Sequence, residues 1–208
     1  MDQTYYITAD CLISGNKVFK NQKLIFEQHE NANAFLEEIY SRFGITYSKF
    51  HKMDQLCKLG FLSAELLLSG KNIGEKYNEA DIGIVLSNSH GSLDVDLRYA
   101  KTIKSGASPA LFVYTLPNIV IGEISIRHRI KGENAFFVFK NFDGNFITEY
   151  VNNIFENSQT KCCICGWVDY FQENYRALLM LVEADNSGEN ALPFTTANMI
   201  KLNQQDHE

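Results

Sequence analysis

The feature that most constrains the fold is the alternation of amphipathic helical patterns with short apolar runs. Residues 53–69 (MDQLCKLGFLSAELLLS) space their leucines as a buried helix does, and Gly70 ends the pattern. Residues 80–87 (ADIGIVLS) form a short apolar run between turn residues, which is typical of a central strand. A second helical pattern, 93–104, follows at once. This alternation predicts an α/β fold in which helices cover a mixed β-sheet.

The remaining elements extend the same pattern. Small residues at Gly60, Ser63 and Ala64 predict that another element packs closely against the 53–69 helix. We expect one domain over 1–184, followed by a polar tail over 185–208 in which 192–194 and 199–202 are able to dock. The other expected strands are 5–13, 135–139, 161–168 and 176–184, and the other expected helices are 31–43 (N-cap Asn31, then Gly44), 116–129 and 143–155 (cap Asp143).

Composition narrows the class of protein. The chain of 208 residues carries a net charge of −6, which argues against a nucleic-acid surface because such surfaces need clustered Lys and Arg. No basic leader precedes an apolar run, and no apolar run approaches the roughly 20 residues that span a bilayer. We therefore expect a cytoplasmic protein. The 15 Phe and 10 Tyr favour core packing over an interface or an apolar ligand.

The five cysteines indicate reduced thiols rather than a disulfide framework. The spacing of Cys162 and Cys165 fits a redox pair or half of a zinc site, but no second CxxC and no paired histidines complete a zinc site. The surrounding residues are typical of a buried strand, in which cysteine packs as a small apolar side chain. We expect a structural role and no metal or other cofactor.

An ordered set of short blocks runs through the middle of the chain: 81–87, His90-Gly91-Ser92-Leu93, Ser108-Pro109, Leu116-Pro117-Asn118, Gly122-Glu123-Ile124, Lys131-Gly132-Glu133-Asn134 and 163–169. In this order and spacing the blocks resemble the N-terminal half of the β-ketoacyl-acyl-carrier-protein synthases, a thiolase-like family, although Glu133 stands where proline is usual. The match is good over 80–169 and looser outside it. The resemblance implies a thiolase-like half: one mixed sheet covered by helices. The block 52–68 also resembles a short group of such proteins associated with aryl-polyene and flexirubin-type pigment pathways.

In that family the reactive cysteine lies about nine residues beyond the glycine of the Lys-Gly block, at a strand-to-helix turn. Counting from Gly132 places Asn141 there, in FKNFDGN. A carboxamide cannot form the acyl thioester that condensation requires. The nearest downstream cysteine is Cys162, beyond a whole predicted helix. The resemblance therefore implies the fold and argues against the reaction.

The family's two other catalytic residues, a pair of His or a His and an Asn, come from a C-terminal half that repeats the fold. The sequence stops about where that half would begin, and His207 lacks the surrounding motif. We expect the condensing triad to be absent.

The resemblance also implies partners. The family pairs the strand before the nucleophile across a dimer interface, so Phe136 and Val138 are candidate interface residues in a homodimer or in a heterodimer with a full-length ketosynthase. Arg127, Arg129 and Lys131 form a small basic cluster that either contacts an acidic acyl carrier protein or is a solvated helix end.

Three functions remain open from the sequence. The first is a β-ketoacyl-synthase-like accessory protein of fatty-acid or polyketide biosynthesis that does not itself condense. The second is an acyl-transfer or hydrolytic enzyme for carrier-bound chains, with a non-standard nucleophile such as Cys57 or a serine near His90. Ser87 or Ser89 would form a nucleophile pair with His90; the alternative is that these residues are only a polar loop. The third is a binding module for an acyl chain.

Overall fold

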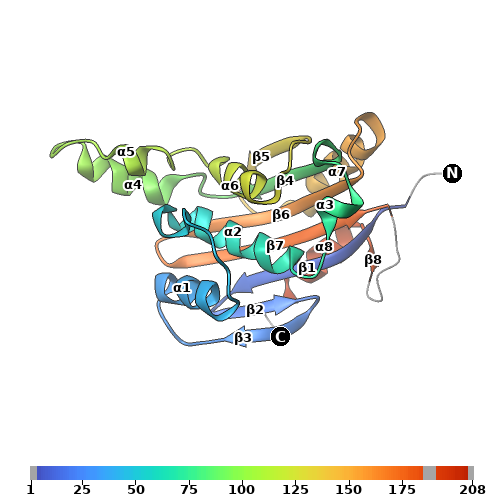
Figure 1. Cartoon of the computed structure of the whole chain (residues 1–208), viewed down its shortest axis with the longest axis horizontal. Coiled ribbons are helices and arrows are strands. Elements are labelled where there is room, and N and C mark those ends of the chain that lie inside the picture. The colour runs from blue at the N-terminus through green and yellow to red at the C-terminus, as the bar shows by residue number, and fades with distance from the viewer. Residues whose placement is uncertain (1–3, 185–190, 206–208) are drawn as a thin grey trace.

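A computed structural model describes residues 4–184 and 191–205, and it consists of one mixed sheet between two layers of helices (Figure 1). The strand order is β3-β2-β1-β7-β6-β4-β5, and β8 pairs with β1 to complete an eight-stranded sheet. The predicted α/β class is confirmed. The strands are β1 (Tyr6–Ser14), β2 (Lys17–Lys20), β3 (Lys23–Glu27), β4 (Ile82–Asn88), β5 (Asn134–Val138), β6 (Cys162–Phe171), β7 (Asn174–Glu183) and β8 (Leu192–Pro193).

Strand direction divides the sheet into two parts. β4 is parallel to both β5 and β6, so the carboxyl ends of these three strands meet at one edge of the sheet. β6, β7, β1, β2 and β3 are successively antiparallel. β5 is an outer strand and exposes one side of its backbone in the described part of the chain.

Three hairpins in the sheet close with the same type of two-residue turn. The two-residue turns Gly15–Asn16, Asn21–Gln22 and Gln172–Glu173 all have positive φ at both residues, with values between 47° and 70°. Such turns match the right-handed twist of the strands that they join. Neither the β1–β2 nor the β2–β3 hairpin was expected from the sequence, although Gly15–Asn16, which joins β1 to β2, is a recognised hairpin signal.

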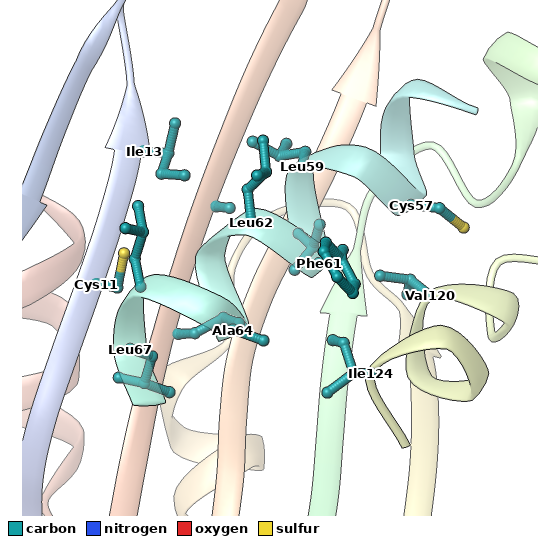
Figure 2. Packing of buried hydrophobic residues seen from close by; sticks show 14 of the residues in the cluster. Cys11, Ile13, Cys57, Leu59, Phe61, Leu62, Ala64, Leu67, Val120 and Ile124 are labelled. Carbon is teal, nitrogen blue, oxygen red and sulfur yellow. The ribbon is translucent and has the colours of Figure 1, made fainter. Parts of the chain in front are cut away.

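One face of the sheet is covered by α1 (Ala32–Arg42), α2 (Gln55–Leu68) and α6 (Ile119–His128). Figure 2 shows α2 crossing the strands, with Val120 and Ile124 of α6 against it. A Cβ on Gly60 would lie 2.3 Å from Cγ2 of Val120, so only glycine allows this close approach. The close packing predicted for this part of α2 is confirmed.

The opposite face is covered by α7 (Gly144–Asn157) and α8 (Thr196–Asn203). Buried Ile147 and Val151 of α7 and Met199 and Leu202 of α8 pack on the sheet. The expected docking of 192–194 and 199–202 is thus observed, as β8 and α8, while 185–190 and 206–208 of the expected tail lie outside the described residues.

The connection after β4 extends beyond the sheet. α4 (Leu93–Thr102) and α5 (Pro109–Phe112) project past the carboxyl end of β4, at the left of Figure 1. α3 (Ile73–Lys76) and two 3₁₀ turns, Phe50–Lys52 and Glu79–Asp81, connect the other elements. The helix expected over 116–129 begins only at Ile119, because a turn precedes Asn118, its N-cap. Of the helices described, none has the length and apolar character that crossing a membrane would need.

Candidate functional site

The candidate site lies at the edge of the sheet where β4, β5 and β6 end. It consists of the β5–α7 loop (139–143), Ser89 and His90 after β4, and Trp167 and Asp169 near the end of β6; we call it the strand-end site. Alternation along β6 places Trp167 and Asp169 on the sheet face that α7 and α8 cover, because their neighbours Cys163 and Cys165 belong to that core cluster. Parallel strands commonly present functional residues at this edge.

Asn141, where the resemblance places the nucleophile, lies exposed in the β5–α7 loop. The helix that follows begins at Gly144, and its N-cap is Asp143. Oδ1 of Asp143 accepts a hydrogen bond from the backbone N–H of Phe146 at 2.9 Å. A carboxylate therefore stabilises the positive end of the α7 dipole, and that end is the position at which a helix would otherwise lower the pKa of a thiol.

The β5–α7 loop is held by aromatic contacts. Phe142 meets Trp167 edge to face, with ring centroids 6.1 Å apart. Phe139 contacts Phe137 and Phe146 at 5.8 Å and 4.9 Å. The loop is thus tied to both β6 and α7, which fixes the setting of Asn141.

Asp169 organises the turn after β4. Its Oδ1 accepts the backbone N–H groups of Ser89 and His90, both at 3.1 Å. Its Oδ2 lies 2.8 Å from Nδ1 of His90 and accepts from Oγ of Ser89 at 3.1 Å. The imidazole also stacks on Phe171, with centroids 4.7 Å apart and planes 5° apart. One carboxylate therefore fixes both the backbone and the ring of His90.

The serines do not form a nucleophile pair with His90. Oγ of Ser89 lies 2.9 Å from Nδ1, the same nitrogen that Asp169 contacts, whereas a catalytic triad places its serine on the other ring nitrogen. Ser87 is buried and donates to the carbonyl of Gly166 at 3.2 Å. The structure thus brings Ser89 and His90 together as parts of a fixed turn.

An open groove of about 600 Å³ borders Asp169. Trp167 and Asp169 line it from β6, and Arg176 lines it from β7. Arg176 donates to Oδ1 of Asn203 at 3.0 Å and to Oγ of Ser14 at 3.1 Å, which ties α8 to the sheet. Burial raises the pKa of Tyr175, a further lining residue, to about 12, so its hydroxyl stays protonated.

The predicted carrier-protein cluster lies on the other face and carries its own counter-ions. Arg127 makes two hydrogen bonds of 2.9 Å to the carboxylate of Glu65. Burial alone would raise the pKa of Glu65, but the contacts with His128 and Arg127 outweigh it and lower the pKa to about 2. Lys131 lies 2.6 Å from Glu79, and Arg129 lies 3.9 Å from the same carboxylate.

The predicted interface residues lie on the outer strand β5. Val138 is 55% exposed and Phe136 is half-buried. The strand reads NAFFV and carries no charged side chain. It is separated from the Arg127 cluster by the turn through Gly132, where a Cβ would lie 2.4 Å from the carbonyl oxygen of Ile82.

The cysteines are buried and unpaired. Burial raises the pKa of every thiol, including that of Cys57, so none of them is an activated nucleophile. Cys162 and Cys165 lie in β6 on opposite faces of the sheet, so the two thiols do not form a redox pair. Within the described ranges no cluster of three or more His, Cys, Asp or Glu could hold a metal ion.

The partnership of His90 with Asp169 was not predicted from the sequence. Asp169 belongs to the 163–169 block of the resemblance, but it lies 79 positions after His90, and no local pattern links the two residues. Only the parallel pairing of β4 with β6, with Ser87 opposite Trp167, brings them together. The capping role of Asp143, in contrast, was predicted and is confirmed.

Comparisons with known proteins agree on the fold. No family model and no curated protein sequence matches the chain. Among solved structures it is similar to the ishigamide ketosynthase/chain length factor, with a TM-score of 0.63 and 15% identity over 89% of this chain. It is also similar to AntDE:AntF, a type II polyketide synthase acyl-carrier protein in complex with its ketosynthase (TM-score 0.57, 12% identity, 88% of this chain).

A third similar structure is the ketosynthase ApeO in complex with its chain length factor ApeC from Xenorhabdus doucetiae, with a TM-score of 0.53 and 10% identity over 87% of this chain and 79% of that chain. The chain spans 63% and 64% of the length of the first two structures. At these identities the comparisons show the fold: it is the ketosynthase-like, thiolase-like fold that the sequence blocks predicted.

Proposed function

We propose that this chain is a ketosynthase-like accessory protein of polyketide or fatty-acid assembly that does not itself condense acyl chains. The observation that carries the proposal is the strand-end site: a ketosynthase-like frame in which an exposed asparagine and a carboxylate-capped helix occupy the position expected for an activated thiol. Condensation needs a covalent acyl thioester, and neither side chain forms one.

The electrostatics of this loop support the same conclusion. A reactive cysteine gains from a helix N-terminus because the helix dipole favours the thiolate. Here the carboxylate of Asp143 already lies at that end of α7 and accepts the hydrogen bond of the backbone N–H of Phe146. An anionic intermediate placed nearby would be repelled by this carboxylate.

The partner that we propose is a full-length ketosynthase or a second copy of this chain, paired through β5. An outer strand with an unpaired backbone and no charge is prone to pair with another strand, and proteins usually blunt such edges with lysine, proline or a bulge. β5 has none of these devices, and Val138 is left exposed beside its open edge. Two of the similar structures are described as ketosynthases with chain length factors.

An acyl carrier protein is the second proposed partner. Arg129 and Lys131 are the candidates for contact, since their side chains are 83% and 70% exposed and share a single carboxylate, that of Glu79. Arg127 adds a positive charge near them, although its guanidinium forms an ion pair with Glu65. Electrostatic attraction to an acidic carrier would act mainly on the rate of association. We further propose that the protein acts in the cytoplasm and serves a pathway of the aryl-polyene type.

Reconstitution with malonyl- and acyl-carrier proteins tests this function. We expect no carbon–carbon bond formation by the chain alone, and co-purification with a full-length ketosynthase encoded nearby. Condensation by the isolated chain would overturn the proposal. So would a chain that neither binds a full-length ketosynthase nor associates with itself. Mass spectrometry of the products distinguishes condensation from hydrolysis in the same reaction.

A further inference from the structure

His90 and Asp169 form a pair that an accessory role does not require. Asp169 is largely buried, with 15% of its side chain exposed, whereas His90 is 39% exposed. A turn needs only the two backbone N–H groups that Oδ1 of Asp169 accepts. The second oxygen instead fixes the imidazole, and the stacked ring of Phe171 fixes its plane.

The geometry defines which ring nitrogen is free. A carboxylate only accepts hydrogen bonds, so Nδ1, 2.8 Å from Oδ2, carries the proton of that bond. All polar contacts of the ring within the described part of the chain are made at Nδ1. In the neutral ring Nε2 therefore holds a lone pair that is able to accept a proton.

Asp169 borders an open groove, and the His90 ring that it holds is partly exposed. Asp169 lines the open groove of about 600 Å³, and Trp167, two residues earlier on the same face, contacts the β5–α7 loop through Phe142. The groove is lined by polar side chains together with the rings of Trp167 and Tyr175. A partly exposed base, an orienting carboxylate and a groove are the elements of a general-base site.

We propose that His90, positioned by Asp169, is the general base of a thioester hydrolase at the strand-end site. The choice of a thioester rests on the proposed function, which supplies acyl chains held on a carrier thiol. Nε2 takes a proton from a water molecule as the water oxygen bonds to the carbonyl carbon. The carbon–sulfur bond then breaks, the sulfur leaves with the proton that Nε2 returns, and the products are a carboxylic acid and a free thiol.

Ser89 is not the nucleophile in this reaction. Its hydroxyl donates to Oδ2 of Asp169 and contacts Nδ1, so it stands on the side of the ring that the base does not use. Water is the nucleophile that remains, and no covalent acyl-enzyme forms. This role would remove stalled chains from a carrier protein.

Hydrolysis of hexanoyl-N-acetylcysteamine by the whole chain, followed as hexanoate by mass spectrometry, tests the proposal. We expect turnover above the buffer rate, and a loss of at least about 100-fold in kcat for His90→Ala, the lower end of the range of general-base effects. Added imidazole should restore part of the rate that is lost in His90→Ala. Asp169→Asn should lower kcat and leave KM unchanged, because the amide still accepts the backbone N–H groups.

Two further variants make the result decisive. His51→Ala removes another exposed histidine that also lies beside a carboxylate, 3.1 Å from Glu37, and should keep the full rate. Ser89→Ala should retain at least about a third of it. No hydrolysis above buffer, an undiminished His90→Ala rate, or a Ser89→Ala loss as large as that of His90→Ala would each overturn the proposal. Because this assay contains no partner, its failure leaves ketosynthase binding and the lack of condensation to be judged separately.

Discussion

The carboxylate of Asp143 accepts a hydrogen bond from the backbone N–H of Phe146 at 2.9 Å, at the turn where the sequence resemblance places a reactive thiol. The contact links a feature of the sequence, an aspartate two residues after Asn141, to the chemistry of the site. It caps α7 and leaves a negative charge at the helix end. Two predictions concern this turn directly.

Asn141→Cys should not create a condensing enzyme. The new thiol would lie in an exposed loop beside the carboxylate of Asp143 rather than at an uncapped helix N-terminus. We expect its rate of alkylation by iodoacetamide at pH 7 to match that of a free cysteine. Alkylation at least about tenfold faster, or condensation with malonyl-carrier protein, would show that the turn still activates a nucleophile.

Asp143→Ala should destabilise the protein by about 1 kcal/mol, the usual effect of removing an N-cap side chain. Asp143→Ser, which keeps an acceptor for the N–H of Phe146, should retain most of the stability. Urea unfolding followed by circular dichroism measures both variants. Equal stability of the alanine and serine variants would contradict the capping role.

Gly60→Ala should destabilise the protein by about 1–3 kcal/mol, because the added methyl group overpacks the contact between α2 and α6. The site has no spare room: Val120 is fully buried, and its Cγ2 lies 2.3 Å from the position of the new Cβ. Combining Gly60→Ala with Val120→Ala should recover part of the loss.

Gly74→Ala in α3 is the matched control for this pair, since its Cβ would meet nothing within 4 Å. Its stability in urea should equal that of the wild type or slightly exceed it. If Gly60→Ala unfolds at the same urea concentration as Gly74→Ala, the close approach of α2 and α6 is not structurally important.

Glu65 should make the free energy of unfolding depend on pH in the acid range. Its pKa is about 2 in the folded protein against 4.5 for the unperturbed group, so its contribution is complete above about pH 4.5 and is lost as the pH falls towards 2. The shift corresponds to about 3 kcal/mol at most. The free energy of unfolding, measured in urea from about pH 6 to about pH 2.5, should fall more steeply for the wild type than for Glu65→Gln.

Glu27→Gln gives the matched comparison for this acid effect. Glu27 forms an exposed pair with Lys17 at 4.0 Å, a geometry that contributes little to stability. Its pH profile should follow that of the wild type. A Glu65→Gln profile as steep as the Glu27→Gln profile would mean that the contacts with Arg127 and His128 do not stabilise the fold.

Val138→Lys should weaken pairing through β5. A charge on an outer strand discourages addition of another strand, and Val138 is already exposed, so the fold itself should tolerate the change. Size-exclusion chromatography with light scattering, with and without a full-length ketosynthase, measures the complex. Exposed Ile126→Lys on α6 is the control, and an equal effect of both variants would show that β5 is not the interface.

Much of the fold followed from local patterns because each of those elements carries its own signal. The 53–69 helix has its leucines, its small residues and a terminal glycine, and it is found as α2 with Asp54 as N-cap. Asn31 and Asp143 cap α1 and α7 as their side chains predict. The β2–β3 hairpin was missed because its strands are only four and five residues long and bury few of their side chains, and the left-handed turn residues Asn21 and Gln22 are its main local signal.

Residue identity and spacing along the chain predicted the α/β class and the ketosynthase-like fold, and the resemblance that rests on them places Asn141 where a thiol is expected. Which side chains meet at the strand-end site depends on the tertiary structure. Asp169 reaches His90 because β6 lies parallel to β4, and α8 lies against the sheet through buried Met199 and Leu202 together with the hydrogen bond from Arg176 to Asn203. Contacts between residues tens of positions apart depend on strand order and register, which short-range patterns do not encode.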